Sequence, residues 1–103
     1  MQVYKLWDEF RNHFNKKFKY TLVAKIDQYF LEIIELFFVA SYLGKEQKQT
    51  YLQKACIKLD LLKFFLQIAW EIKSLDNKKY IVLSEKLDEI GRMIGGWNRQ
   101  LST

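Results

Sequence analysis

The chain has 103 residues, a formal net charge of +5, one cysteine and one histidine. This length fits a single domain over residues 1–103. Half of the residues are hydrophobic, which excludes an intrinsically disordered protein. A lone cysteine excludes an internal disulfide and argues against a Cys/His zinc site. No uncharged run approaches the roughly 20 residues of a membrane span. No apolar signal core follows the N-terminus, so we expect a soluble, cytoplasmic protein.

Apolar residues recur at intervals of three and four, which is the helical period, and no alternating strand pattern competes with it. The first predicted helix covers residues 2–15 and fades at Asn15, where the following lysines suit a helix C-terminus. Its apolar stripe is Val3, Trp7, Phe10 and Phe14. The second predicted helix covers residues 20–43, with Thr21 as a plausible cap and Gly44 as its stop. Its stripe is Leu22, Ile26, Tyr29, Ile33, Phe37 and Ala40.

The third and fourth predicted helices cover residues 45–74 and 78–101, with Asp76 or Asn77 as the cap between them. The fourth has the most regular stripe: Tyr80, Leu83, Leu87, Ile90, Ile94, Trp97 and Leu101. Short connections make consecutive helices antiparallel neighbours. The sequence therefore predicts an all-α, antiparallel, up-down-up-down four-helix bundle.

The second and third predicted helices have more apolar surface than one core needs. Behind the main stripe of the third helix (Tyr51, Ala55, Leu59, Leu62, Leu66 and Ala69) lies a second apolar face, and the second helix has a weaker one. The candidate interface residues on these second faces are Ile34, Phe38, Leu61, Phe64, Phe65, Ile68 and Ile72. Contiguous exposed apolar patches usually mark association surfaces, so we expect a homo-oligomer. The alternative is that a small bundle uses wide stripes because its aromatic side chains are large.

Gly91 and Gly95 are four residues apart within the last predicted helix, and Ser84 precedes them on the same stripe. Each glycine costs a helix about 1 kcal/mol relative to alanine. We interpret the stripe as a place where another helix or a bulky ring approaches closely. The alternative is that the glycines only loosen the end of the helix.

No catalytic constellation is recognisable. His13 has no nucleophile nearby and reads as a surface residue, and Cys56 reads as a structural thiol. Phosphate-binding glycine loops are absent. Asp60 and Glu71 share a helix face, but a ferritin-like metal site needs Glu-x-x-His pairs that the chain lacks. We therefore expect no enzymatic activity, no metal and no cofactor.

Basic side chains are the remaining functional signal. Lys16, Lys17 and Lys19 cluster after the first helix, and other basic residues recur on the third and fourth helices. The candidate nucleic-acid-binding residues are Lys54, Lys58, Lys63, Arg92 and Arg99. A solvated face of mixed charge is the alternative, but an oligomer would sum the positive field. The aromatic residues lie on apolar stripes, so we expect no exposed aromatic–basic run and only weakly sequence-specific binding of RNA and DNA.

Two blocks carry a family resemblance. Residues 61–70 (LLKFFLQIAW) and 87–97 (LDEIGRMIGGW) resemble the accessory variability determinant (Avd) proteins of diversity-generating retroelements, and residues 35–40 are similar to that family's second helix. The order and spacing of these blocks extend over nearly the whole chain. The same small-bundle superfamily includes the intervening-sequence proteins encoded within some ribosomal RNA genes.

The resemblance implies a four-helix bundle assembled as a pentameric ring. It also implies a positive surface that binds nucleic acid and the element's reverse transcriptase, in an accessory protein without catalytic activity. Lys63 matches a basic position of the family and Arg92 matches the arginine of its Gly-Arg pair; Arg92 could instead bond Asp88 or a neighbouring subunit. Two alternatives stay open: an RNA-binding intervening-sequence-type protein and a purely structural oligomerisation module.

Overall fold

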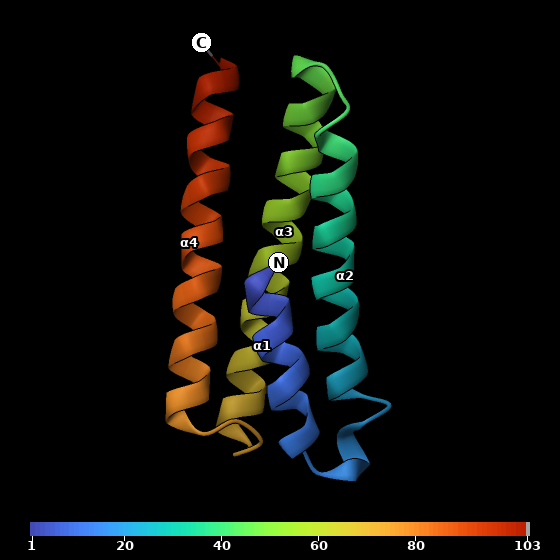
Figure 1. Cartoon of the computed structure of the whole chain (residues 1–103), viewed down its shortest axis with the longest axis vertical. Helices are drawn as coiled ribbons and strands as arrows, with labels where there is room; N and C mark the ends of the chain where they lie inside the picture. The colour runs from blue at the N-terminus through green and yellow to red at the C-terminus, as the bar shows by residue number, and fades with distance from the viewer. Residues whose placement is uncertain (103) are drawn as a thin grey trace.

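The computed structural model describes residues 1–102, and these form four α-helices and no strand. The helices are α1 (Gln2–Phe10), α2 (Leu22–Ala40), α3 (Lys45–Glu71) and α4 (Asn77–Ser102). Two short 3-10 helices, η1 (Arg11–His13) and η2 (Lys16–Phe18), connect α1 to α2. Consecutive α-helices run in opposite directions (Figure 1). The predicted all-helical architecture is confirmed, and its four helices are compatible with a bundle.

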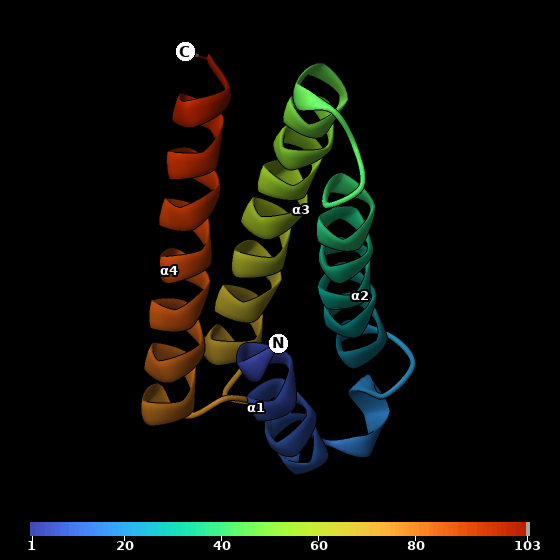
Figure 2. The same ribbon diagram turned by 45° about the horizontal axis from the view of Figure 1, so that its top comes forward.

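The three long helices stand side by side, and α1 covers only part of their length. The helix α3 packs against both α2 and α4, and α1 packs against α4. Figures 1 and 2 show α1 and its connection to α2 at the end of the molecule where α3 ends and α4 begins. None of the helices in the described part of the chain combines the length and low polarity that a bilayer crossing requires.

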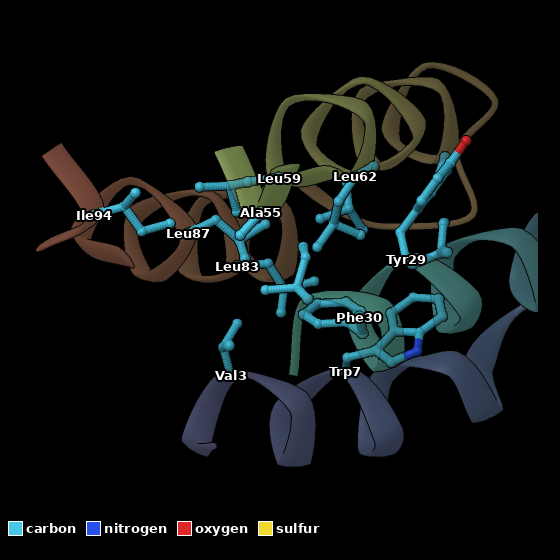
Figure 3. Close-up of a cluster of buried hydrophobic side chains, with 14 of the residues drawn as sticks. Val3, Trp7, Tyr29, Phe30, Ala55, Leu59, Leu62, Leu83, Leu87 and Ile94 are labelled. Carbon is cyan, nitrogen blue, oxygen red and sulfur yellow. The ribbon is translucent and has the colours of Figure 1, made fainter. Parts of the chain in front are cut away.

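The core forms where the predicted stripes meet. The buried apolar residues include Val3, Trp7, Ile26, Tyr29, Ile33, Ala55, Leu59, Leu62, Leu66, Ala69, Leu83, Leu87 and Ile94. Figure 3 shows side chains from all four helices converging on this cluster. Phe30 lies outside the predicted stripe of its helix, yet it is 1% exposed because its ring stacks on Trp7 at a centroid distance of 5.9 Å.

The first helix is shorter than predicted. A continuous helix over residues 2–15 is wrong beyond Phe10, because the backbone at Phe14 is extended, with ψ 149°. Phe14 leaves the helix but keeps its place in the core, edge-on to Trp7 at a centroid distance of 5.5 Å. The Asn15 side chain then accepts a hydrogen bond from the Lys17 backbone nitrogen at 3.1 Å and caps η2. Phe14 therefore packs against Trp7 as the apolar stripe predicted, although it lies outside the helix.

One carboxylate ties α1 and η1 to α2. The Oδ1 atom of Asp27 accepts hydrogen bonds from Tyr4 Oη at 2.9 Å, Trp7 Nε1 at 3.3 Å and Arg11 Nη1 at 3.1 Å. Arg11 also pairs with Asp8 at 2.8 Å. Burial, and then the bond to Asp27, raise the pKa of Tyr4, so its hydroxyl stays protonated and donates at neutral pH. Three donors from successive turns thus share one acceptor.

The opposite end of the bundle is open because α1 does not reach it. An apolar cavity of about 300 Å³ lies there between α2, α3 and α4, and Phe37, Leu52 and Trp97 are among its lining residues. Trp97 was predicted to continue the core seam, but it is 40% exposed at this opening. Its ring meets Phe37 edge-on at a centroid distance of 6.0 Å.

Replacement of Asp27 by alanine should lower the free energy of unfolding by about 2 kcal/mol, because hydrogen bonds to a charged group contribute roughly 1.5–3 kcal/mol each and are not additive here. Urea denaturation followed by circular dichroism measures the change. Asp60→Ala, at an exposed position of α3, is the matched control and should stay within about 0.5 kcal/mol of the wild type. Equal stability of the two variants would contradict the role assigned to Asp27.

Candidate nucleic-acid interface

Three of the candidate basic residues line one shallow groove on the outside of the α3–α4 pair. Lys63 comes from α3, and Arg92 and Arg99 come from positions about two turns apart on α4. The groove has a volume of about 590 Å³, and Gly91 and Gly95 contribute bare backbone to its lining. Residues 29 positions apart in the sequence thus present their charges to one surface, which is a geometry that suits an extended anion.

The two glycines differ in what lies beside them. A Cβ atom on Gly91 would lie 3.5 Å from Leu59 Cδ2, so Gly91 sits where α4 packs against α3. A Cβ atom on Gly95 would meet no atom of the described chain within 4 Å. We expected another helix or a bulky ring to pack closely against the stripe of Ser84, Gly91 and Gly95. At Gly95, no described residue of this chain does so, and the backbone there faces open space.

The acidic residue of the groove pairs with its lysine. Lys63 Nζ lies 2.9 Å from Asp88 Oδ1, so Asp88 bridges α4 to α3 and does not neutralise Arg92. Within residues 1–102, neither Arg92 nor Arg99 forms an ion pair. Both guanidinium groups are therefore available, and a guanidinium matches the geometry of a phosphate through two parallel hydrogen bonds.

The other two candidate lysines do not join this groove. Lys58 reaches toward α2, where its Nζ lies 3.0 Å from Glu32 Oε2 and 5.5 Å from the centre of the Tyr29 ring. The hydrogen bond from Gln28, and then that from Lys58, lower the pKa of Glu32. Lys54 is exposed one turn earlier on α3. The charge of Lys58 is thus largely compensated, as is that of Lys63, while Arg92 and Arg99 have no ion pair among the described residues.

The predicted interface residues lie at or near the surface. Phe38, Phe64 and Ile72 are 64%, 56% and 44% exposed. Ile34, Leu61, Phe65 and Ile68 are half-buried. The Phe65 ring packs against Tyr29 at a centroid distance of 5.6 Å, so it belongs partly to the fold of the single chain. The second faces of α2 and α3 therefore leave large apolar side chains in contact with water.

His13 and Cys56 are the two residues predicted to have no catalytic role. His13 is exposed in η1, and Cys56 is half-buried on α3. Burial raises the pKa of the Cys56 thiol, so it stays protonated at neutral pH. In the described part of the chain, no group of three or more His, Cys, Asp or Glu residues is placed to hold a metal ion.

Comparison with known proteins identifies a family. A sequence model described as bAvd-like matches residues 3–101, a range that includes both blocks on which the resemblance was based. The resemblance predicted from those blocks is therefore confirmed. No curated protein and no solved structure matches the chain.

Replacement of Gly95 by alanine should raise the free energy of unfolding by about 1 kcal/mol, because the substitution restores helix propensity and the new methyl group meets no atom. Chemical denaturation measures the gain. Gly91→Ala is the comparison, and its gain should be at least as large, because its methyl group would also make ordinary van der Waals contact with Leu59 at 3.5 Å. A loss of stability in Gly95→Ala would contradict the open groove and indicate that another copy of the chain packs there.

Proposed function

The chain belongs to the bAvd-like family, and from this premise we propose that it is a non-enzymatic accessory protein of a diversity-generating retroelement. In this role it binds nucleic acid and the element's reverse transcriptase. It supports the mutagenic copying of template RNA into cDNA, and the reverse transcriptase supplies the chemistry. Family membership carries the accessory role, and the charged groove supports the nucleic-acid contact.

The single observation that supports nucleic-acid binding best is the convergence of Lys63, Arg92 and Arg99 on one groove. Bare backbone at Gly95 lets a phosphate chain approach the helix closely. The charged groups of this groove suit phosphates, which are common to all sequences and to both RNA and DNA. Binding through the groove is therefore weakly specific, and selection of the template falls to the reverse transcriptase.

Self-association completes the proposal. The exposed apolar side chains on α2 and α3 lose contact with water when copies of the chain pack together. Burying one Phe, Leu or Ile side chain fully contributes about 1.5–3 kcal/mol. A pentameric ring repeats the groove in every subunit and sums its positive field, which increases the attraction for a polyanion.

Light scattering at micromolar concentration should show a homo-oligomer, with five subunits preferred. Phe38→Glu and Phe64→Glu should shift it toward monomers, because each places a charge on an exposed apolar face while leaving the buried core untouched. Gln53→Glu adds the same charge at an exposed polar position of α3 and should leave the size unchanged. A monomeric wild type would remove the assembly from this proposal.

The double replacement Lys63→Gln and Arg92→Gln should weaken the binding of labelled RNA and leave the oligomer intact. Each lost phosphate contact makes the negative slope of log affinity against log salt less steep by roughly 0.7–0.9. Titrations at two salt concentrations, beside a size measurement, test this.

The double replacement Lys54→Gln and Lys58→Gln removes the same number of charges and is the matched control. It should weaken binding less, because neither Lys54 nor Lys58 lines the groove and Arg92 stays in place. Salt-insensitive binding, or no binding by the wild-type oligomer at low salt, would refute the nucleic-acid role and favour a protein–protein adaptor.

A further inference from the structure

The net charge of the protein resides in one short segment. Residues 11–25 contain five of the 17 Lys and Arg residues and no Asp or Glu, so their formal charge of +5 equals that of the whole chain. The remaining 12 basic residues balance the 12 acidic ones. This segment comprises η1, η2 and the start of α2, and it lies at the end of the molecule shown in Figure 2 beside the α3–α4 turn. Arg11 is paired with Asp8 and Asp27, but Lys16, Lys17 and Lys19 form no ion pair with any described residue, so this end of the molecule offers a positive surface besides the groove.

Two aromatic anchors hold this segment on the body of the protein. Phe14 is buried against Trp7, and Phe18 packs half-buried against the core. The backbone between and after them is hydrogen-bonded, with Asn15 capping η2 and Phe18 O accepting from Thr21 N at 3.2 Å. The segment thus has a defined backbone conformation, which fixes the positions from which its exposed side chains project.

Those exposed side chains combine cations with an aromatic face. Lys16, Lys17 and Lys19 are exposed, and Tyr20 is 83% exposed, more than any other large apolar or aromatic residue described. Lys19 Nζ lies 5.4 Å from the centre of the Tyr20 ring. The sequence led us to expect no exposed aromatic–basic run, and the structure shows that this expectation is wrong for residues 16–20.

A hollow of about 490 Å³ accompanies the run. Lys16, Lys19, Tyr20 and Arg11 are among its lining residues. Asp27 also lines it, but its Oδ1 atom is already engaged by Arg11 at 3.1 Å and by Tyr4 and Trp7. The acidic group is therefore compensated from within the fold, and the lysines of the hollow are left for an external anion.

We propose that residues 16–20 form a second contact surface, for single-stranded nucleic acid, in which Tyr20 stacks on an unpaired base while Lys16, Lys17 and Lys19 contact the flanking phosphates. Aromatic stacking beside a basic surface is how proteins hold single strands with little sequence preference. A duplex offers its phosphates but keeps its bases stacked on one another, so it gains nothing from Tyr20. An acidic peptide would engage the lysines and leave the exposed ring without a partner. This inference rests on the proposed nucleic-acid role, but it assigns a separate surface and a particular strand form.

The test compares an unstructured single-stranded RNA with a hairpin RNA of equal length, each labelled and titrated with the wild-type oligomer and its variants. Tyr20→Ala should weaken single-strand binding about tenfold, in line with the loss of one stacked base, and leave hairpin binding unchanged. Tyr20→Phe should restore single-strand binding, because the ring is kept. Tyr42→Ala is the matched control, since Tyr42 is 76% exposed in the α2–α3 turn at the other end of the molecule; because its ring lies 5.2 Å from that of Phe38, the size of this variant is measured beside the titration.

The remaining outcomes separate this inference from the proposed function. Wild-type affinity of Tyr20→Ala for the single strand, or equal losses on both RNAs, would overturn the stacking surface while the Lys63 and Arg92 variant still tests the groove. A single-strand loss in Tyr20→Ala without any loss in the groove variant would support this surface and refute the groove. Polyglutamate is tested as a competitor of the labelled single strand. If it displaces the strand as effectively as unlabelled RNA does, and does so equally in Tyr20→Ala, residues 16–20 would be assigned to an acidic protein partner instead.

Discussion

The packing of α3 between α2 and α4 is the constraint on which the other features of this structure depend. Leu59, Leu62 and Leu66 of α3 are almost fully buried, which requires neighbours on two sides of one helix. The close approach of α4 at Gly91 then brings Asp88 within 2.9 Å of Lys63. The groove follows from that packing, because Lys63 of α3 and Arg92 and Arg99 of α4 line it together.

The short α1 has a different physical basis. It buries Val3 and Trp7, but its attachment to α2 also depends on polar bonds to Asp27. A carboxylate with three donors tolerates partial burial, since its charge is shared among them. The same arrangement pairs Asp27, the acidic residue that lines the hollow beside Lys16 and Lys19, with Arg11. Structural attachment and the electrostatics of the connecting segment are thus linked through one residue.

Charge and apolar surface are distributed unevenly over the molecule. Residues 11–25, which connect α1 to α2 and begin α2, have a formal charge equal to that of the whole chain, and the other basic and acidic residues balance. Large apolar side chains remain outside on α2, α3 and α4, among them Phe38, Phe64 and Met93. In the proposed ring, the apolar surfaces bring subunits together and the basic surfaces stay available. This division of surfaces supports the proposed role of the chain as a scaffold for nucleic acid and reverse transcriptase.

The sequence by itself determined the number and type of helices, most of the buried stripe residues and the family. Those properties are local: a stripe such as Leu83, Leu87 and Ile94 repeats with the helical period whatever packs against it. Only the tertiary structure decided that α1 ends at Phe10 and that Trp97 lies at an opening. It likewise decided that Lys58 pairs with Glu32 while Lys63 joins Arg92 and Arg99. Such outcomes depend on which helix faces meet, and the distances between residues remote in sequence arise only when the helices pack.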